Sequence, residues 1–129
     1  MKSEISPTEV KEWGLEELAA LIVGTRFRYF EERDLQSAIE ALLIEHSVPY
    51  LREFALSRAD RIDFLCGRVG IEVKIESSMP TVQRQLWRYA ADDQIDSLIL
   101  VTTLTKHRGI ARTMNDKPVF VAYLISSIF

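Results

Sequence analysis

Two short apolar runs joined by a glycine-containing link, in the stretch RIDFLCGRVGIEVKI at 61–75, constrain the fold of this chain more than any other feature. Both runs are rich in β-branched and other apolar residues, and we expect one strand over 61–65 and another over 71–76. The link between them is short and contains Gly67 and Gly70. The pattern therefore predicts a β-hairpin.

Three charged residues interrupt these apolar runs. Side chains alternate between the two faces of a strand, so Glu72 and Lys74 point to the same face, about 6.5 Å apart along the strand. If the hairpin pairs across its turn, Asp63 on the neighbouring strand reaches that face as well. Two converging carboxylates offer the oxygen ligands that Mg²⁺ prefers. A lysine beside them is able to orient or deprotonate a water, or to stabilise charge on a phosphate.

A solvated strand face is the simpler interpretation of such charges. The context favours a site, because the strands that carry them occupy a central place in the order of elements. They also accompany the run SLILVTT at 97–103, a continuous apolar stretch typical of a strand buried on both faces. Solvated charge is less expected in such surroundings.

The rest of the chain predicts further helices and strands around this hairpin. The residues at 6–9, Ser-Pro-Thr-Glu, are typical of a helix start, and the helix that follows extends to Gly24 with Gly14 as an interruption. We further expect a helix over 31–47, a strand over 50–56, a helix over 80–93, a strand over 97–103, a short helix or loop over 106–114, a turn over 115–118 and a strand over 119–125. This order predicts an α/β fold with a mixed central β-sheet flanked by helices.

Composition and charge exclude several classes of protein. The net charge is −3, with 16 basic and 19 acidic residues, which argues against a chain-wide basic surface of the kind that binds nucleic acid nonspecifically. A local basic groove is still compatible with this balance. The single cysteine, Cys66, excludes an internal disulfide and a zinc site built from several cysteines. No apolar run is long enough to cross a bilayer and the N-terminus lacks a signal peptide, so we expect no membrane partner and a cytoplasmic location.

A second cluster of polar residues follows on the helix after the hairpin. Gln85 and Tyr89 are four residues apart and share a helix face, and Arg84 and Arg88 form a neighbouring pair. In a functional interpretation Gln85 lies near the acidic site and the arginines contact phosphates. In the alternative interpretation Tyr89 belongs to the core and the arginines are solvated.

Gln36 and Glu40 flank the apolar stripe of the helix over 31–47, again four residues apart. Either is placed to reach a metal held by the hairpin, and a polar helix flank is the simpler interpretation of each. Of the two histidines, His46 lies on the apolar face of that helix, which predicts a core or edge position. His107 lies in the polar stretch TKHRG, where we expect a surface residue or a contact to a nucleic-acid phosphate.

These residues, in this order of elements, resemble the PD-(D/E)XK nuclease superfamily. The resemblance rests on Asp63, on the triplet EVK at 72–74 and on QLWRY at 85–89, which is similar to the Gln-x-x-x-Tyr element of the RecB-like and phage-exonuclease-like branches. The small size and the stretch LREFALSRADRIDFL look like compact phage- or prophage-type members. The length of 129 residues predicts a single domain over 1–129. The resemblance covers about 31–124 and implies a restriction-endonuclease-like αβββαβ core over 31–125, with the helical extension over 1–30 outside it.

The resemblance also implies a role for each residue of the site. Asp63, Glu72 and the backbone carbonyl of Val73 are the ligands of a magnesium (Mg²⁺) or manganese (Mn²⁺) ion. Lys74 is the catalytic lysine, and Gln85 positions DNA or the attacking water.

The supporting residues are less firmly placed by the resemblance. Tyr89 supports Gln85, and the acidic residue that the family often carries on its first core helix corresponds to Gln36 or Glu40, a choice that the sequence leaves open. Ile62 stands where the superfamily name has proline. If the helix position is Gln36, one ligand charge is missing, which would weaken metal binding but need not abolish catalysis.

The leading hypothesis is therefore a nuclease, a metal-binding hydrolase that cleaves DNA, or RNA, by activating a water. The expected nucleic-acid contacts are Arg61, Arg84, Arg88, Lys106 and Arg108. One alternative is a nuclease-fold protein with weak or no catalysis that acts as a nucleic-acid-binding or assembly subunit. Another is docking of a partner or a second copy, as in a homo-oligomer, through Trp13 and the helix over 15–22. Neither the form of the substrate nor endonuclease against exonuclease action follows from the sequence.

Overall fold

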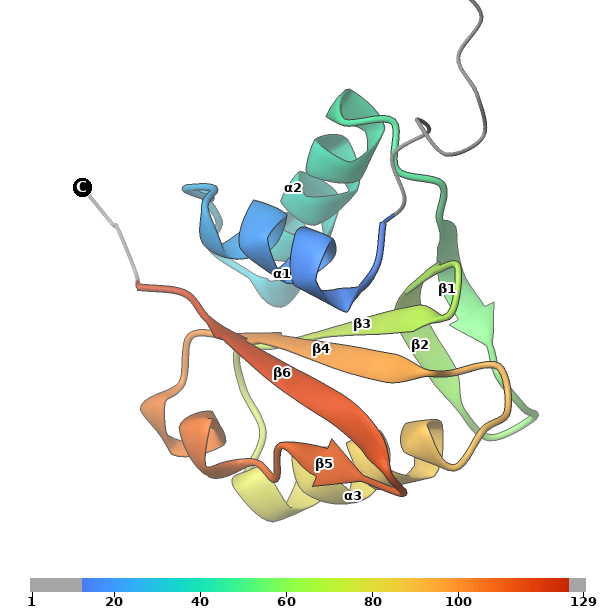
Figure 1. The fold of residues 1–129 in the computed structure, drawn as a ribbon. Helices are drawn as coiled ribbons and strands as arrows, with labels where there is room; N and C mark the ends of the chain where they lie inside the picture. Colours follow the sequence, from blue (N-terminus) through green and yellow to red (C-terminus); the bar gives the residue numbers. More distant parts are fainter. Residues whose placement is uncertain (1–12, 126–129) are drawn as a thin grey trace, which may run out of the picture.

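The computed structural model describes residues 13–125, which form one mixed β-sheet with helices on both of its faces (Figure 1). The helices are α1 (Leu15–Val23), α2 (Glu32–Glu45) and α3 (Met79–Ala90), with a short 3₁₀-helix, η2 (Thr105–Gly109). The strands are β1 (Leu51–Ala55), β2 (Arg61–Cys66), β3 (Val69–Lys74), β4 (Ser97–Thr102), β5 (Thr113–Met114) and β6 (Lys117–Tyr123). The sheet has six strands in the order β1-β2-β3-β4-β6-β5, so the predicted α/β fold with a mixed sheet is confirmed.

Strands β2 and β3 form the antiparallel hairpin that the sequence predicts. Their register pairs Phe64 with Ile71 and Cys66 with Val69, so β3 begins two residues earlier than expected. The turn is correspondingly short, and Gly67 within it has a φ of 61°. This left-handed conformation is one that glycine adopts without a steric penalty, which explains the glycine at this point of the hairpin.

The sheet becomes parallel beyond β3. Helix α3 connects β3 to β4 over one face, and β4 pairs in parallel with β3 and with β6. Every position of β4 is buried, as expected for a strand covered on both faces. The final turn is shorter than predicted, because Lys117 and Pro118 already pair with β5 and only Asn115 and Asp116, both with positive φ, make the turn.

Helix α1 begins after Gly14 and does not run through it. The Gly14 N–H donates to Glu17 Oε1 at 3.1 Å, so the side chain of the first turn satisfies a backbone donor that the helix leaves unpaired. The predicted helix start at 6–9 lies outside the described residues. Helix α2 begins in a similar way, because Asp34 Oδ2 accepts the N–H of Glu31 at 2.8 Å.

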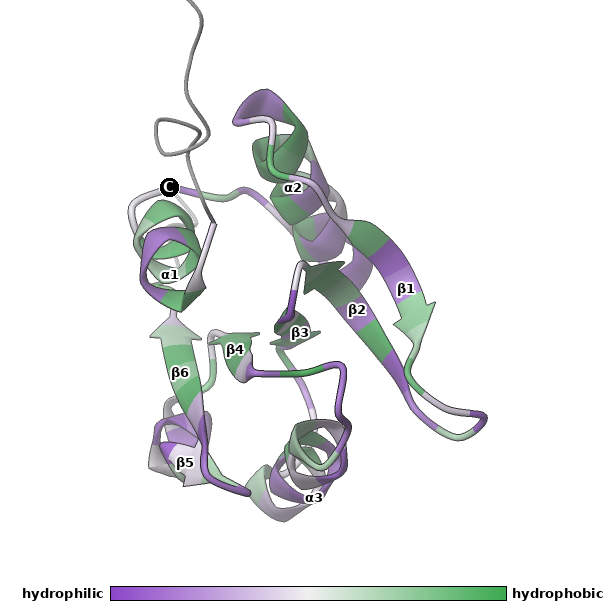
Figure 2. Cartoon of the chain, turned by 45° about the vertical axis from the view of Figure 1, so that its right-hand side comes forward, coloured by the Kyte–Doolittle hydropathy of each residue, from purple (hydrophilic) through white to green (hydrophobic). Residues whose placement is uncertain are grey.

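Two apolar cores lie on the two faces of the sheet. Residues of α1 and α2, among them Leu18 and Leu35, pack on one face, and residues of α3, among them Leu86, pack on the other. Figure 2 shows the apolar strands β4 and β6 between these helix layers. Gly70 makes room for the second core, because a Cβ there would clash with the side chain of Ile62. No helix within residues 13–125 is long and apolar enough to cross a membrane.

Candidate active site

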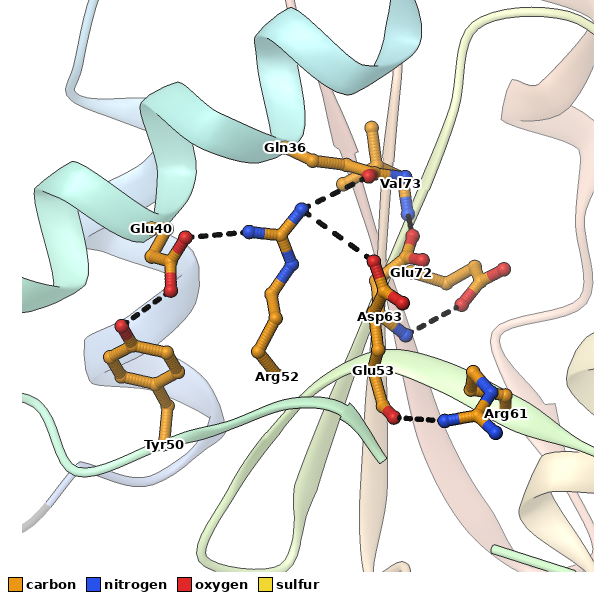
Figure 3. A network of polar contacts seen from close by, with 9 residues as sticks. All are labelled: Gln36, Glu40, Tyr50, Arg52, Glu53, Arg61, Asp63, Glu72 and Val73. Carbon is orange, nitrogen blue, oxygen red and sulfur yellow. Dashed lines mark hydrogen bonds and ion pairs between the residues drawn. The ribbon is translucent and has the colours of Figure 1, made fainter. Parts of the chain in front are cut away.

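The candidate site lies where β2 and β3 separate. The backbone ladder between them runs from the turn to the pair Phe64–Ile71. Beyond that pair, two side chains replace the ladder: the N–H of Asp63 donates to Glu72 Oε1 at 3.2 Å, and the N–H of Val73 donates to Asp63 Oδ2 at 2.8 Å (Figure 3). The alternation predicted for the hairpin therefore brings both carboxylates into the gap between the strands.

Lys74 completes the charged centre. Its Nζ lies 3.4 Å from Glu72 Oε2, with the Lys74 side chain 20% exposed and the Glu72 side chain 3% exposed. The structure thus brings together the three charged residues that the sequence singles out in the hairpin. An ammonium group and two carboxylates in so little water interact far more strongly than they would on an open surface.

Burial shifts the protonation of both acids. It raises the pKa of Asp63 to about 6, a shift opposed by the hydrogen bond from the Val73 N–H and by the positive charge of Lys74. Burial and, next, the negative charge of Asp63 raise the pKa of Glu72 to about 8. Both carboxyls therefore hold protons more tightly than free acids do, as expected for buried acids that lie beside each other.

The donor atoms at this point suit a hard divalent cation. Val73 directs its N–H toward Asp63, and the N–H and C=O of one strand residue face the same neighbouring strand, so its carbonyl also faces the gap. Two carboxylates and one carbonyl match Mg²⁺, which commonly binds one or two protein carboxylates and keeps several waters. Within residues 13–125 no group of three or more His, Cys, Asp or Glu residues gathers to bind a metal.

Helix α3 closes one side of the site with Gln85 and Tyr89. Gln85 Nε2 donates to the Tyr89 hydroxyl at 2.7 Å, and that hydroxyl donates to the carbonyl of Arg61 at 2.9 Å, with Glu72 Oε2 3.5 Å away. The Tyr89 ring is 1% exposed, so it is both a core residue and a neighbour of the acids. Burial raises the pKa of the Tyr89 hydroxyl, which therefore stays protonated and able to donate.

The helix residues that the sequence offers as a fourth ligand lie elsewhere. Gln36 Oε1 accepts from Arg52 Nη2 at 3.3 Å, and Glu40 forms an ion pair of 2.6 Å with Arg52 Nη1 (Figure 3). Glu40 Oε2 also accepts the hydroxyl of Tyr50 at 2.6 Å. Neither residue is hydrogen-bonded to Asp63 or Glu72 in the described structure.

Glu32 is an acidic residue of α2 that contacts the segment after β3, and the sequence reasoning missed it. Its Oε1 accepts the N–H of Ile75, the residue after β3, at 3.1 Å. Its charge contributes to the raised pKa of Asp63, after the effect of burial. The signal was present in the sequence, because Glu32 precedes Gln36 by four residues and continues the same helix face.

Arg52 is a second residue that the sequence reasoning missed. The guanidinium carbon lies 5.1 Å from the centre of the Phe64 ring, and the side chain is 26% exposed. Its Nε is buried without a hydrogen-bond partner within the described chain. Its positive charge also opposes the rise in the pKa of Asp63, so β1 contributes a cation to the wider site.

The five residues expected to contact nucleic acid are all exposed. Arg84, Lys106 and Arg108 are exposed, and the guanidinium of Arg108 lies 4.9 Å from the ring centre of Tyr123. Arg61 Nη1 donates to the carbonyl of Glu53 at 2.7 Å, and Arg88 Nε pairs with Asp60 at 2.9 Å.

Both histidines contact other residues of the fold. The surface position expected for His107 is wrong: it is 0% exposed, with Nδ1 2.7 Å from Thr102 Oγ1 and Nε2 2.9 Å from the carbonyl of Ser77. The polar neighbours of His107 in the sequence suggest a solvated residue. In the fold its hydrogen-bond partners come from β4 and from the segment after β3, so the ring lies inside the protein. His46 is exposed at the end of α2, where its ring lies edge-on to Trp13 with centroids 6.5 Å apart.

Comparisons of this chain with known protein families, with characterised proteins and with solved structures find no match. The candidate site consists of two buried or half-buried acids, a lysine 3.4 Å from one of them, and a glutamine–tyrosine pair that closes the side.

Proposed function

We propose that this protein is a metal-dependent nuclease that hydrolyses phosphodiester bonds of DNA at the Asp63–Glu72–Lys74 centre. The observation that carries the proposal is the meeting of two carboxylates and one ammonium where β2 and β3 separate. A solvated strand face would leave such charges in water, whereas Glu72 is 2% exposed. Strongly perturbed ionisable groups clustered at one point favour a functional site over a structural one.

The order of elements supports this assignment. One helix, an antiparallel set of three strands, a crossover helix and a parallel strand follow one another in α2, β1, β2, β3, α3 and β4. This is the order expected of a restriction-endonuclease-like core, with α1 added before it. Asp63, the triplet at 72–74 and the Gln85–Tyr89 pair carry the resemblance to PD-(D/E)XK nucleases, and their closeness in the structure supports the proposal.

A Mg²⁺ or Mn²⁺ ion would be held by Asp63, Glu72 and the carbonyl of Val73, with Glu32 at the margin of the site. When bound, such an ion lowers the pKa of a water and offsets negative charge on the phosphate. The raised pKa values of both acids suit this role, because a divalent cation supplies the positive charge that two adjacent buried carboxylates lack.

The protein's own side chains orient the reactants around that ion. Lys74 places its ammonium where negative charge develops on the phosphate, which lowers the barrier most in a site that excludes water. Gln85 is fixed through its amide nitrogen by Tyr89, so its amide oxygen is available to orient a water or a nucleotide. The exposed Arg61 and Arg84 supply charge for the phosphate backbone.

A cleavage assay tests the proposal directly. Supercoiled plasmid, linear duplex, single-stranded DNA and RNA are each incubated with the full chain in Mg²⁺, in Mn²⁺ or in EDTA. We expect cleavage of DNA that EDTA abolishes, and a loss of roughly 100-fold or more in Lys74→Ala, the range lost when a positioned acid, base or electrostatic group is removed. Lys117→Ala is the matched control, because Lys117 is also half-buried but donates to the carbonyl of Asp92, away from the site.

Two results would contradict the proposal. Cleavage that persists in EDTA shows that the acids do not work through a cation. Retention of DNA on a gel without cleavage in either metal favours the alternative, a nuclease-fold protein that binds nucleic acid or serves an assembly. Binding of Mn²⁺ measured by calorimetry, with Asp63→Asn and Glu72→Gln against Asp96→Asn as control, reads the metal site without reference to activity.

A further inference from the structure

An exposed apolar surface lies along α1 and β6, at the other end of the sheet from β1. A hollow there is lined by Leu15, Ala19, Ala20, Val23 and Phe120, together with Glu16. Val23 is 51% exposed and Phe120 is 39% exposed. A second hollow shares Val23 with the first and continues to the end of β6, and we name the two hollows together the α1–β6 groove.

Strand β6 also presents an open backbone edge. Strand β5 covers it only at Lys117 and Pro118. The N–H of Leu124 donates inward to the carbonyl of Thr102, and the N–H of Val119 donates outward to the carbonyl of Arg112. Backbone groups alternate along a strand, so those of the odd-numbered residues that follow Val119 point outward as well.

The outward groups are those of Val121 and Tyr123, and no strand of the described chain pairs with them. An open edge of this kind is a template for pairing with another strand. The apolar α1–β6 groove runs directly beside it, since both Phe120 and Tyr123 line the groove. An open strand edge and an exposed apolar groove therefore lie at the same place, and one partner is able to cover both.

The two ends of the groove carry opposite charge. Glu16 lines the end near Phe120, and Arg26 lines the end near Tyr123. Helix α1 thus runs beside β6 in the same direction along the chain. A partner that fits this surface has an apolar centre, a basic end against Glu16 and an acidic end against Arg26.

We propose that this partner is a second copy of the chain, joined by a two-fold axis that pairs the two β6 edges antiparallel and sets the two α1–β6 grooves against each other. A two-fold axis reverses the groove of the second copy, so Glu16 of each copy meets Arg26 of the other. The surface is therefore complementary to itself, because strand edge pairs with strand edge, apolar groove packs on apolar groove, and Glu16 meets Arg26. Glu16 and Arg26 are both exposed in the single chain.

The proposed pairing extends the sheet across both copies and leaves the candidate active sites open. Asp63 and Glu72 lie on β2 and β3. In the sheet order β4 separates β3 from β6, and the proposed interface is the outer edge of β6, which β5 covers only at its start. The dimer is therefore independent of whether the site cleaves DNA.

Sedimentation of the full chain over a range of concentrations tests the proposal. We expect a dimer at micromolar concentration. Val23→Glu puts two like charges near the apolar centre of the interface, because Val23 lines both hollows, and is expected to raise the dimer dissociation constant by roughly 100-fold or more. Ile44→Glu is the matched control, because Ile44 is an exposed apolar residue on α2, outside the groove, at 61% exposure.

A charge exchange tests the two-fold geometry. Glu16→Arg alone or Arg26→Glu alone sets like charges together at both ends of the interface, and each is expected to raise the dissociation constant about tenfold. In the mixed dimer formed from the two variants, opposite charges face each other again at both ends, so mixing them restores association. A monomeric parent chain overturns the proposal, and so does a mixture that associates no better than either variant alone.

Discussion

The N–H of Asp63 donates to the carboxylate of Glu72 at 3.2 Å, and the carboxylate of Asp63 accepts the N–H of Val73 at 2.8 Å. This exchange stands where a backbone ladder would otherwise continue between β2 and β3. The two acids are therefore fixed by the strands themselves and not by a flexible loop. Such fixation lets two groups that repel one another stay adjacent, at the cost of raised pKa values.

The first prediction concerns the stability of the metal-free protein. The pKa of Asp63 is raised from 3.8 to about 6 and that of Glu72 from 4.5 to about 8. The folded state holds these two protons more tightly than the unfolded state does. The contribution of the two acids to the unfolding free energy is therefore greatest below about pH 4 and is lost as the pH rises to about 8. A tenfold difference in proton affinity between the folded and unfolded states corresponds to about 1.4 kcal/mol for one group. Urea unfolding in EDTA at pH 5 and pH 8 measures the fall.

The variant Glu72→Gln checks the origin of this slope. The amide has nearly the same shape and does not ionise, so the unfolding free energy is expected to depend on pH much less. Addition of Mg²⁺ to the parent chain is expected to raise the melting temperature more at pH 8 than at pH 5, since the cation favours the ionised acids. An equal pH slope in parent and variant would contradict the assignment to Glu72.

The second prediction concerns Tyr89. Tyr89→Phe keeps the buried ring and removes the hydroxyl that joins Gln85 to the carbonyl of Arg61. We expect a loss of about 1–2 kcal/mol of unfolding free energy, because two buried polar partners are left unsatisfied. If Gln85 acts through this hydroxyl, Gln85→Ala and Tyr89→Phe lower the cleavage rate by similar factors. The double variant is then no worse than either single one, as measured in single-turnover assays.

The third prediction concerns the ion pair between Arg52 and Glu40. Glu40→Ala leaves a largely buried guanidinium with fewer partners and deprives the Tyr50 hydroxyl of its acceptor, so we expect a loss of about 2–3 kcal/mol. Arg52→Met removes the cation as well, and the double variant is expected to lose less than the sum of the two single losses. Additive losses in urea unfolding would show that the pair contributes no coupling.

The hairpin and its charges were predictable from sequence because they depend on local rules. Alternation places Glu72 and Lys74 on one face of β3. The short turn at the left-handed Gly67 brings β3 back beside β2, which carries Asp63. Such rules act over a few residues and are little affected by the rest of the fold. The same holds for Gln85 and Tyr89, whose spacing on one helix face is fixed by the helix itself.

The contact of Glu32 with Ile75 was not predictable, because Glu32, Gln36 and Glu40 share one face of α2. Which turn of the helix lies beside β3 depends on where the helix sits on the sheet, and that position is set by packing of the whole apolar core. The sequence pattern identifies the polar face of α2 but not which residue along that face lies beside β3. Arg52 was missed for a related reason, since its partners on α2 are distant in sequence.

His107 provides the last prediction. The carbonyl of Ser77 only accepts hydrogen bonds, so His107 Nε2 carries a proton and donates to it. His107 Nδ1 lies 2.7 Å from Thr102 Oγ1, which also accepts the N–H of Leu104 at 3.1 Å. Ser77 has a φ of 92°, an unfavourable conformation for a residue with a side chain, so the surrounding contacts must hold it there.

We therefore expect His107→Ala to lower the unfolding free energy by about 2–4 kcal/mol, through a buried cavity and the loss of two hydrogen bonds. His46→Ala is the matched control and is expected to change it by less than about 0.5 kcal/mol, because His46 is exposed. The second substitution Ser77→Gly relieves the strained backbone and is expected to recover about 1 kcal/mol in the His107→Ala chain. If His107→Ala unfolds at the same urea concentration as the parent, the buried ring does not hold the segment between β3 and α3. If Ser77→Gly recovers nothing, the strain at Ser77 is not what His107 opposes.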